Sequence, residues 1–288
     1  MKRVVTIQDI SCIGKCSLTV ALPILSAAGV ETAVIPTALL STHTAFNRFE
    51  FFDLTDKIEP IANHFYEEGF GFDAIYTGYL GSFEQLKTVS DFIDRFKSKG
   101  TLVVIDPVMG DNGKLYSGFD RGFAHSMANL CKKADIIIPN LTESAFLLGM
   151  DEVPQSPDFD TVKSMLKKLT ELGPKIALMT GVSNQEGQLG AMGYNSETDT
   201  FFGSFCEHIQ ATFHGTGDIF ASAFVGATLG GATLDSATET AVEFTSRSIK
   251  ATLNDKDGRW YGVNFESALP WFINHLKGAY DESIPSVD

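Results

Sequence analysis

Residues 74–105 read AIYTGYLGSFEQLKTVSDFIDRFKSKGTLVVI. Two short apolar runs, Ala74–Thr77 and Leu102–Ile105, flank a longer segment, Phe83–Lys97, in which apolar residues recur at helical spacing. The two runs are continuous rather than alternating, as expected of strands that are covered on both faces. Gly100 follows the helical segment where a left-handed C-cap residue is expected. The stretch therefore predicts a β-α-β unit of a parallel sheet.

The same alternation of strand and helix extends from this unit to both ends of the chain. Further strands are predicted at Val4–Ile7, Thr32–Ile35, Ile136–Ile138 and Ile176–Thr180, and an antiparallel edge pair at Leu189–Tyr194 and Thr200–Cys206. Further helices are predicted at Leu18–Ala28, Ile58–Glu68, Gly122–Cys131, Glu143–Leu148, Val162–Leu172, Gly217–Leu229, Leu234–Leu253 and Phe265–Leu276. Because no linker interrupts the pattern, we expect residues 1–288 to form a single α/β domain with three α/β/α layers, a mostly parallel central sheet and an antiparallel edge. Only the end of the chain, from about Tyr280, is predicted to be a loose tail.

The composition excludes several classes of function. The chain has 288 residues with 22 Lys and Arg against 36 Asp and Glu, which gives a formal net charge of −14. Nucleic acid and an anionic membrane surface would both be repelled, so small molecules are the expected partners. The four cysteines contain no C-x-x-C pair and indicate reduced thiols and a cytoplasmic location. No apolar run is long enough for a signal peptide or a membrane span.

The most informative polar segment is His214-Gly215-Thr216-Gly217-Asp218, directly before an apolar helical run. Its glycines allow a sharp turn and a close approach of the backbone to a ligand, and the free N–H groups of the following helix favour an anion. Asp218, in the first helical turn, could accept a proton from an attacking hydroxyl group. Alternatively, Asp218 only complements the helix dipole and the glycines form an ordinary turn.

Five segments, taken together, resemble those of a known family. They are Ser41-Thr42-His43-Thr44, Gly78-Tyr79-Leu80-Gly81-Ser82, Asp106-Pro107-Val108-Met109-Gly110-Asp111, Pro139-Asn140-Leu141-Thr142-Glu143 and Gly215-Thr216-Gly217-Asp218. In this order and spacing, over almost the whole chain, they resemble the pyridoxal kinase family of the ribokinase-like fold. The resemblance implies transfer of the γ-phosphoryl group of ATP to the 5′-hydroxymethyl group of pyridoxal, pyridoxine or pyridoxamine. Members of the family form homodimers, and we expect a homodimer here by analogy.

The resemblance also implies roles at the start of the last glycine-rich segment. Asp218 matches the catalytic base of the family. Gly215, Thr216 and Gly217 match the anion hole that holds the transferring phosphoryl group. Because phosphoryl transfer has a loose transition state with charge on the equatorial oxygens, these N–H donors should contribute more than proton removal does.

Further roles implied by the resemblance concern the metal and the nucleotide. Asp106 and Glu143 match carboxylates that hold Mg²⁺ around the triphosphate, mainly through water. Asn140 matches an amide near the phosphates, and Asp111 and Thr180 match positions near the phosphates and a site for K⁺.

These residues also have purely structural interpretations. Asp106 before Pro107 is a common way to end a strand. Asn140 could simply cap the next helix, with Glu143 well placed for the helix dipole. Ile138 stands where the family often has Thr, which is a departure at the expected K⁺ site.

The resemblance places the vitamer near the first strands. Tyr79 would present a ring face to the flat pyridine, and His43 and Thr44 would supply polar contacts at its edge, although His43 could instead be a structural residue. Familiar members read Gln-Ser-His after the first strand, whereas this chain has Asp9 at the position of that Ser. A carboxylate favours a cationic partner, either a protonated ring nitrogen or an aminomethyl group. We therefore hypothesise a preference for pyridoxamine.

Other functions compete with this interpretation. A hydroxymethylpyrimidine kinase of thiamine metabolism shares the fold and typically has HGTG followed by Cys, where this chain has Asp218. A non-catalytic vitamer-binding protein would need neither a base nor metal-binding carboxylates. Gly14-Lys15-Cys16-Ser17 resembles the end of a P-loop but lacks a Ser or Thr directly after the Lys, so Lys15 is expected to be a solvated charge or a charge at the pocket rim.

Overall fold

The computed structural model describes the backbone of residues 1–280 and the side chains of residues 1–277. Within these residues the chain forms one nine-stranded sheet and a separate two-stranded hairpin. None of the described helices combines the length and the apolar character that crossing a bilayer requires. The predicted loose tail beyond Tyr280 lies outside the described residues.

Most of the elements lie close to their predicted positions. The strands are β1 (Arg3–Ile13), β2 (Glu31–Thr42), β3 (Phe51–Asp53), β4 (Ala74–Thr77), β5 (Leu102–Ile105), β6 (Gly110–Asp111), β7 (Lys114–Leu115), β8 (Ile136–Ile137), β9 (Ile176–Val182), β10 (Gln188–Asn195) and β11 (Thr200–Glu207). The helices are α1 (Leu18–Ala27), α2 (Thr55–Glu67), α3 (Phe83–Phe96), α4 (Arg121–Cys131), α5 (Leu141–Leu147), α6 (Phe159–Glu171), α7 (Thr216–Leu229), α8 (Leu234–Asn254) and α9 (Leu269–Tyr280). The last predicted helix is divided, because a 3₁₀ turn, Phe265–Ala268, precedes α9.

The large sheet is mostly parallel, as predicted. Its strand order is β11-β10-β9-β8-β5-β4-β1-β2-β3, and the strands from β9 to β2 run parallel to their neighbours. The predicted antiparallel edge consists of β10 and β11. A second antiparallel edge, which the sequence analysis did not predict, arises where β3 pairs with β2. Since β3 has only three residues, all of them exposed, it is too short to show an alternating pattern.

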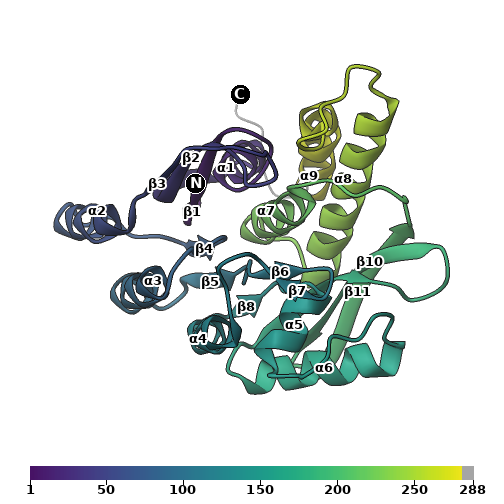
Figure 1. Ribbon diagram of the computed structural model, residues 1–288, viewed down its shortest axis with the longest axis horizontal. Coiled ribbons are helices and arrows are strands. Elements are labelled where there is room, and N and C mark those ends of the chain that lie inside the picture. Colours follow the sequence, from purple (N-terminus) through teal and green to yellow (C-terminus); the bar gives the residue numbers. More distant parts are fainter. Residues whose placement is uncertain (281–288) are drawn as a thin grey trace.

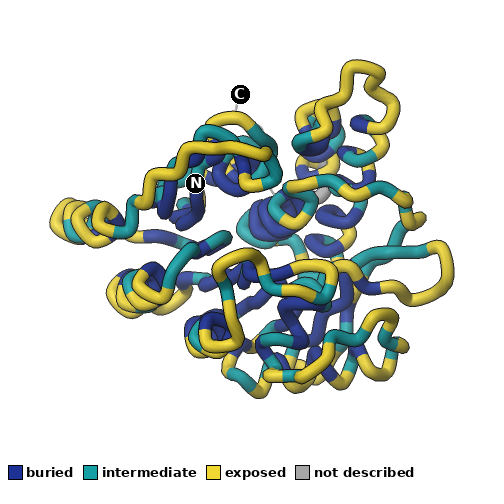
Figure 2. Tube along the Cα trace, viewed as in Figure 1, coloured by how far each residue is buried: buried dark blue, intermediate teal, exposed yellow. Residues whose placement is uncertain are grey.

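Helices cover both faces of the sheet, which gives the predicted three layers (Figure 1). One hydrophobic core lies between the sheet and the layer that runs from α2 to α6, and a second lies between the sheet and α1, α7, α8 and α9. Figure 2 shows the central strands buried and the outer helix faces exposed. α7 is buried without interruption from Ile219 to Ala227, since it packs between the sheet and other helices. Its first turn therefore has a fixed position relative to the strand ends.

The first two strands continue well beyond their predicted ends at Ile7 and Ile35. β1 and β2 stay paired as far as Ile13 and Thr42, with a register shift between Gln8 and Ile10. Gln8 and Asp9 suggested the end of a strand because they are polar, but both side chains are buried. The extension brings Asp9 inside the molecule rather than onto a surface loop.

Candidate active site

A cleft of about 480 Å³ opens beside the carboxyl ends of β5, β8 and β9. The residues predicted for catalysis, metal binding and nucleotide binding all line it. They are Asp106, Asp111, Asn140, Glu143, Thr180 and the segment Gly215–Asp218. The parallel sheet thus brings together side chains that are far apart in the sequence.

Gly215 forms the turn that begins α7. Its φ of +81° lies in the left-handed region, and a Cβ atom there would collide with the backbone oxygen of Lys15. Only glycine fits both constraints without strain. The first N–H groups of a helix have no partner within the helix, so the turn presents backbone donors and the positive end of the dipole to the cleft. This arrangement can hold an anion of phosphate size.

Asp218 lies in the first turn of α7, beside these donors. Burial raises the pKa of its carboxyl group to about 7, and the negative charge of Asp9 adds to the shift, although a hydrogen bond with the backbone of Ser17 opposes it. A base with a pKa close to neutral pH is well matched to general-base catalysis. The position and the pKa together allow Asp218 to accept a proton at neutral pH.

Asp106 and Glu143 form a buried carboxylate pair. Asp106 directly follows β5 and is 7% exposed, while Glu143 lies in α5 and is 3% exposed. Burial raises the pKa of both groups, and the charge of Glu143 also raises the pKa of Asp106. Glu143 closes a capping box: its Oε2 accepts a hydrogen bond from the Asn140 backbone N–H at 2.9 Å, and its Oε1 accepts one from the Met109 N–H at 3.1 Å. Two fixed carboxylates that are costly to ionise alone would be stabilised by a cation.

The predicted nucleotide-binding residues also hold the wall of the cleft together. Asn140 accepts a hydrogen bond from the N–H of Glu143 at 2.9 Å and donates one to the carbonyl oxygen of Gly110 at 2.8 Å. Asp111 accepts hydrogen bonds from the backbone and the side chain of Asn112. Thr180 forms a parallel bridge with Asn140. The structural interpretation of Asn140 as a helix cap is therefore correct, and it does not conflict with a place beside a nucleotide.

None of the four predicted vitamer residues lines the large cleft, and Asp9 lies near the base. Asp9 and Asp218 interact electrostatically, and the charge of Asp9 also raises the pKa of Tyr79 after the larger effect of burial. Both ring nitrogens of His43 are engaged: Nε2 lies 2.8 Å from the Tyr261 carbonyl oxygen, and Nδ1 accepts from the Ala45 N–H. His43 can therefore offer a ligand only its ring.

Thr44 follows His43 on an exposed turn. The same region contains an aromatic cluster in which Phe46 lies 4.5 Å from Trp260 and His43 lies 5.0 Å from His214, measured between ring centroids. This cluster joins loops from three parts of the chain beside the anion-binding turn. Trp260 and Tyr261 of the loop 259–262 pack here against Phe46 as an aromatic cap.

Lys15 does not act as a P-loop lysine and is not freely solvated. Its Nζ donates hydrogen bonds to Asn264 Oδ1 at 3.0 Å and to Glu266 Oε2 at 2.8 Å. Its backbone oxygen lies against Gly215 and its side chain against Gly262. The lysine fixes the loop that supports the anion-binding turn.

Sequence reasoning missed several residues that line the cleft. Tyr116 on the loop after β7 and the residues of α8 at Thr245, Ser246 and Ile249 all contribute to its wall. Residues on α8 resemble any other positions of an amphipathic helix, and only the packing of α8 against the cleft gives them this role. The sequence contained no local signal for them.

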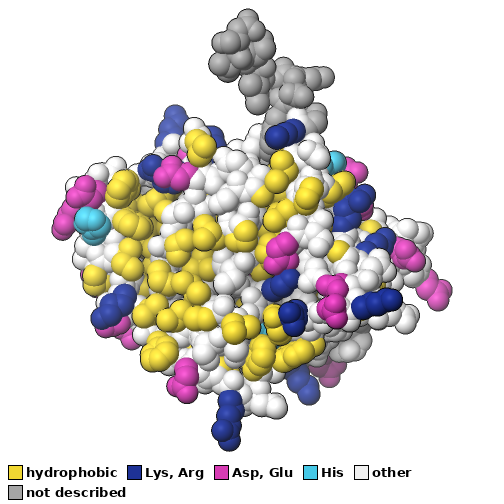
Figure 3. Space-filling view, turned by 90° about the horizontal axis from the view of Figure 1, so that it is seen from above, with side chains coloured by type: hydrophobic (Ala, Val, Ile, Leu, Met, Phe, Trp, Pro, Cys, Tyr) yellow, Lys and Arg dark blue, Asp and Glu magenta, His cyan; other side chains and the backbone are white. Residues whose placement is uncertain are grey.

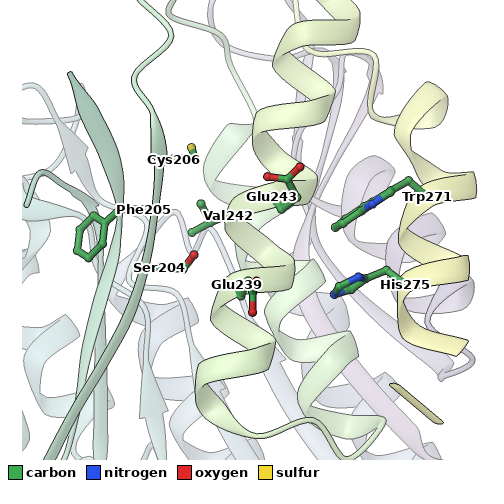
Figure 4. Close-up of a pocket in the computed structure, with 8 residues that line it drawn as sticks. All are labelled: Ser204, Phe205, Cys206, Glu239, Val242, Glu243, Trp271 and His275. Carbon is green, nitrogen blue, oxygen red and sulfur yellow. The ribbon is translucent and has the colours of Figure 1, made fainter. Parts of the chain in front are cut away.

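A second, smaller cavity of about 220 Å³ lies between β11, α8 and α9. Figure 4 shows Trp271 and His275 of α9 facing α8, which carries Glu239 and Glu243. Arg247 pairs with Glu243 at 2.8 Å and lies over the Trp271 ring, 4.6 Å from its centroid. His275 stacks on the same tryptophan. Because Glu243, Arg247, Trp271 and His275 already pair or stack with one another, we place the candidate active site in the larger cleft.

Comparison with known proteins agrees with the geometry of the cleft. The phosphomethylpyrimidine kinase family model matches residues 24–262. A Bacteroides thetaiotaomicron protein described as a phosphomethylpyrimidine kinase is 35% identical, with a TM-score of 0.90 over 100% of this chain and 96% of that chain. An orthorhombic crystal form of that protein contains pyridoxal.

Two relatives that are named as kinases of B6 vitamers are similar to this chain over most of their length. Pyridoxal kinase from Lactobacillus plantarum is 28% identical, with a TM-score of 0.87 over 96% of this chain and 99% of that chain. The pyridoxine/pyridoxal/pyridoxamine kinase of Bordetella avium is 25% identical over 268 residues, which are 86% of this chain and 85% of the relative. The resemblance to pyridoxal kinases and their ribokinase-like fold is confirmed, and the chain belongs to the phosphomethylpyrimidine kinase family.

Proposed function

We propose that this protein uses ATP to phosphorylate the 5′-hydroxymethyl group of the B6 vitamers pyridoxal, pyridoxine and pyridoxamine. The observation that carries the proposal is the placement of Asp218, with a pKa of about 7, beside the glycine turn that begins α7. The vitamer names of the relatives support the choice of substrate.

The proposed step needs one base and one anion hole. The hydroxymethyl oxygen attacks the γ-phosphorus, and the new O–P bond forms while the bond from phosphorus to the bridging oxygen of ADP breaks. Asp218 takes the hydroxyl proton. The backbone N–H groups around Gly215–Gly217 stabilise the charge on the equatorial phosphoryl oxygens.

Asp106 and Glu143 fit a magnesium ion bound together with the nucleotide. Mg²⁺ keeps several waters and needs only one or two carboxylates in sites of this kind. Within the described residues no group of three or more His, Cys, Asp or Glu could hold a metal ion by itself. The ion would neutralise charge on the triphosphate, and we propose that K⁺ binds near Asp111 and Thr180.

ADP formation from ATP tests the proposed function directly. Purified protein is assayed with pyridoxamine, pyridoxal, pyridoxine, hydroxymethylpyrimidine and ribose, with Mg²⁺ or with EDTA, and with or without K⁺. We expect turnover of the vitamers, loss of activity in EDTA and stimulation by K⁺. Vitamers that bind tightly without any turnover would instead indicate a non-catalytic binding protein.

A hydroxymethylpyrimidine kinase is the second candidate. His214 before Gly215-Thr216-Gly217 matches that relative, and the description of the family model names a pyrimidine. Turnover of hydroxymethylpyrimidine alone in the same assay would establish this function and reject the vitamer kinase.

Asp9 is the proposed reason for a preference for pyridoxamine. Its side chain is buried, with 5% of its surface exposed, and its charge raises the pKa of Tyr79 after the larger effect of burial. It forms no salt bridge with a Lys or Arg of the described residues. A protonated aminomethyl group would supply the missing positive charge, and a hydrogen bond between charged groups is stronger than a neutral one.

The variant Asp9→Ser tests this preference. The ratio of kcat/KM for pyridoxamine to that for pyridoxine should fall by about tenfold, on the scale of one lost charge-assisted hydrogen bond. Asp160→Ser, at an exposed aspartate on α6 whose side chain is 95% exposed, is the control and should keep the wild-type ratio. An unchanged ratio in Asp9→Ser would remove Asp9 as the determinant.

A homodimer and a cytoplasmic location complete the proposal. Hydrophobic side chains gather over the part of the molecule that contains β1–β3 (Figure 3). Ile13, Phe51 and Phe52 in these strands are 55%, 45% and 56% exposed, and a second copy of the chain would cover them. All four cysteines are free, as in a reducing compartment.

A further inference from the structure

Three buried oxygen atoms from different elements lie near one another between β1, β4 and α7. They are Gln8 Oε1, the Tyr76 hydroxyl and Ser222 Oγ, and all three residues are 0% exposed. Burial and the charges of Asp106 and Asp218 raise the pKa of the Tyr76 hydroxyl, whereas hydrogen-bonding contacts with the side chains of Ser222 and Gln8 lower it. None of the three atoms has a hydrogen-bond partner of good geometry within the described residues.

Such a group of atoms is costly in a dry interior. A buried donor or acceptor without a partner is strongly unfavourable, and a Phe at position 76 would avoid one of the three. Interior water molecules occur where two to four polar groups converge, and they typically make about three hydrogen bonds. The convergence of Gln8, Tyr76 and Ser222 matches that requirement.

The hydrogen-bond capacities of the three groups define how a water would bind. The Gln8 amide nitrogen already donates to Thr6 Oγ1 at 2.8 Å, so its oxygen is the free acceptor. A water that accepts from the Tyr76 and Ser222 hydroxyls and donates to Gln8 Oε1 has one O–H left over. Asp218 lies one helical turn before Ser222 on the same face of α7, and its charge raises the pKa of the Tyr76 hydroxyl after the larger effects of burial and of Asp106.

We propose that Gln8, Tyr76 and Ser222 bind an internal water whose remaining O–H is donated to the carboxylate of Asp218. The three side chains are then positioning residues for the base, because they fix its carboxylate through this water. The positioning role rests on the proposed phosphoryl transfer. The water site itself does not.

The variant Tyr76→Phe distinguishes a hydrated site from a dry one. If the water is bound, the variant loses one of its donors, so the melting temperature falls. In that case kcat drops about threefold to tenfold with an unchanged KM for ATP, on the scale of one hydrogen bond. If the site is dry, removing an unpaired hydroxyl raises the melting temperature and leaves kcat unchanged, which would overturn the proposal.

Ser222→Ala provides an independent test with a matched control. Ser248 is also a fully buried helical serine, but its hydroxyl donates to the Phe244 carbonyl oxygen at 2.7 Å. Ser222→Ala should lower kcat and move the acidic limb of the pH profile upward, since the carboxylate loses its water donor, whereas Ser248→Ala should change neither. Equal effects of the two variants on the pH profile would reject a specific role for Ser222.

High-resolution crystallography of the wild-type protein and of Tyr76→Phe completes the test. Density for a water within hydrogen-bond distance of Tyr76, Ser222 and Gln8 is expected in the wild type. Its absence would reject the site whatever the enzyme phosphorylates. Conversely, a protein that shows the water but turns over no vitamer would reject only the proposed function.

Discussion

Asp218 has a pKa of about 7 because the protein surrounds its carboxyl group and Asp9 repels its charge. The base must be ionised to accept a proton, so turnover should rise with pH through about 7 and level off above it. Asp218→Ala should lower kcat by about 10²–10⁴, with little change in the KM for ATP, on the usual scale for loss of a general base. Steady-state kinetics from pH 5.5 to 9 would measure both effects, and the variant should lose the acidic limb.

Asp218→Asn is the control for this prediction, because it keeps the shape of the side chain while removing the basic oxygen. Both variants should have a similar kcat. Near-normal turnover in either of them would show that Asp218 is not the base. The structural interpretation, in which Asp218 only complements the helix dipole, would then be correct.

The sequence identified the candidate site residues that have a local signature. Asp218 follows a glycine turn, Asp106 precedes a proline and Glu143 stands three residues after an N-cap asparagine. The sequence could not predict the environment of Asp9, because its burial depends on the continued pairing of β1 with β2. The converging oxygens of Tyr76 and Ser222 were also beyond prediction, since they belong to separate elements that meet only in the folded chain.

At the level of elements, the loop before α1 supports the turn before α7. Lys15 has a side chain that is 18% exposed and is held by Asn264 and Glu266, while its backbone oxygen touches Gly215. Lys15→Met keeps the aliphatic stem but removes the charge. We expect kcat to fall about threefold to tenfold and the melting temperature to drop, because the hydrogen bonds that fix the loop are lost.

Lys87 provides the matched control for Lys15. It also pairs with a carboxylate, Asp91, but its side chain is 78% exposed on α3. Lys87→Met should leave kcat and the melting temperature nearly unchanged, as is usual for surface ion pairs. If Lys15→Met behaves like Lys87→Met, the loop does not support the anion-binding turn.

Elements with strong periodicity were predicted well, and those with weak periodicity were not. The β-α-β unit from Ala74 to Ile105 is confirmed, because continuous apolar strands and an amphipathic helix leave local patterns. The hairpin of β6 and β7 was missed, since two strands of two residues have no pattern of their own. β3 was missed for the same reason.

At the scale of the whole molecule, the exposed apolar side chains of β1–β3 predict self-association. The double variant Phe51→Asp, Phe52→Asp places two charges on this surface and should convert the proposed dimer into a monomer, because charges are depleted from the cores of interfaces. Sedimentation velocity would measure the change in mass.

Leu253→Asp is the control for the dimer prediction. Leu253 is 55% exposed near the end of α8 and belongs to none of the strands β1–β3, so the variant should remain a dimer. A wild-type protein that sediments as a monomer, or a double variant that stays dimeric, would contradict this choice of interface. The sequence could only suggest a dimer by analogy, because the exposure of Phe51 and Phe52 depends on the edge that β3 forms.

The bond between Lys15 and residues 264–266 also has a consequence for protein synthesis. Lys15 is separated from its partners by 249 and 251 positions. Lys15 is therefore synthesised early, but its two hydrogen bonds can form only after residues 264 and 266 have been added. A nascent chain stalled before residue 264 can pair all of the strands of its sheet, since β11 ends at Glu207. It cannot complete the support beneath the phosphoryl-binding turn. We therefore expect the support of this turn to form only when the chain is almost complete.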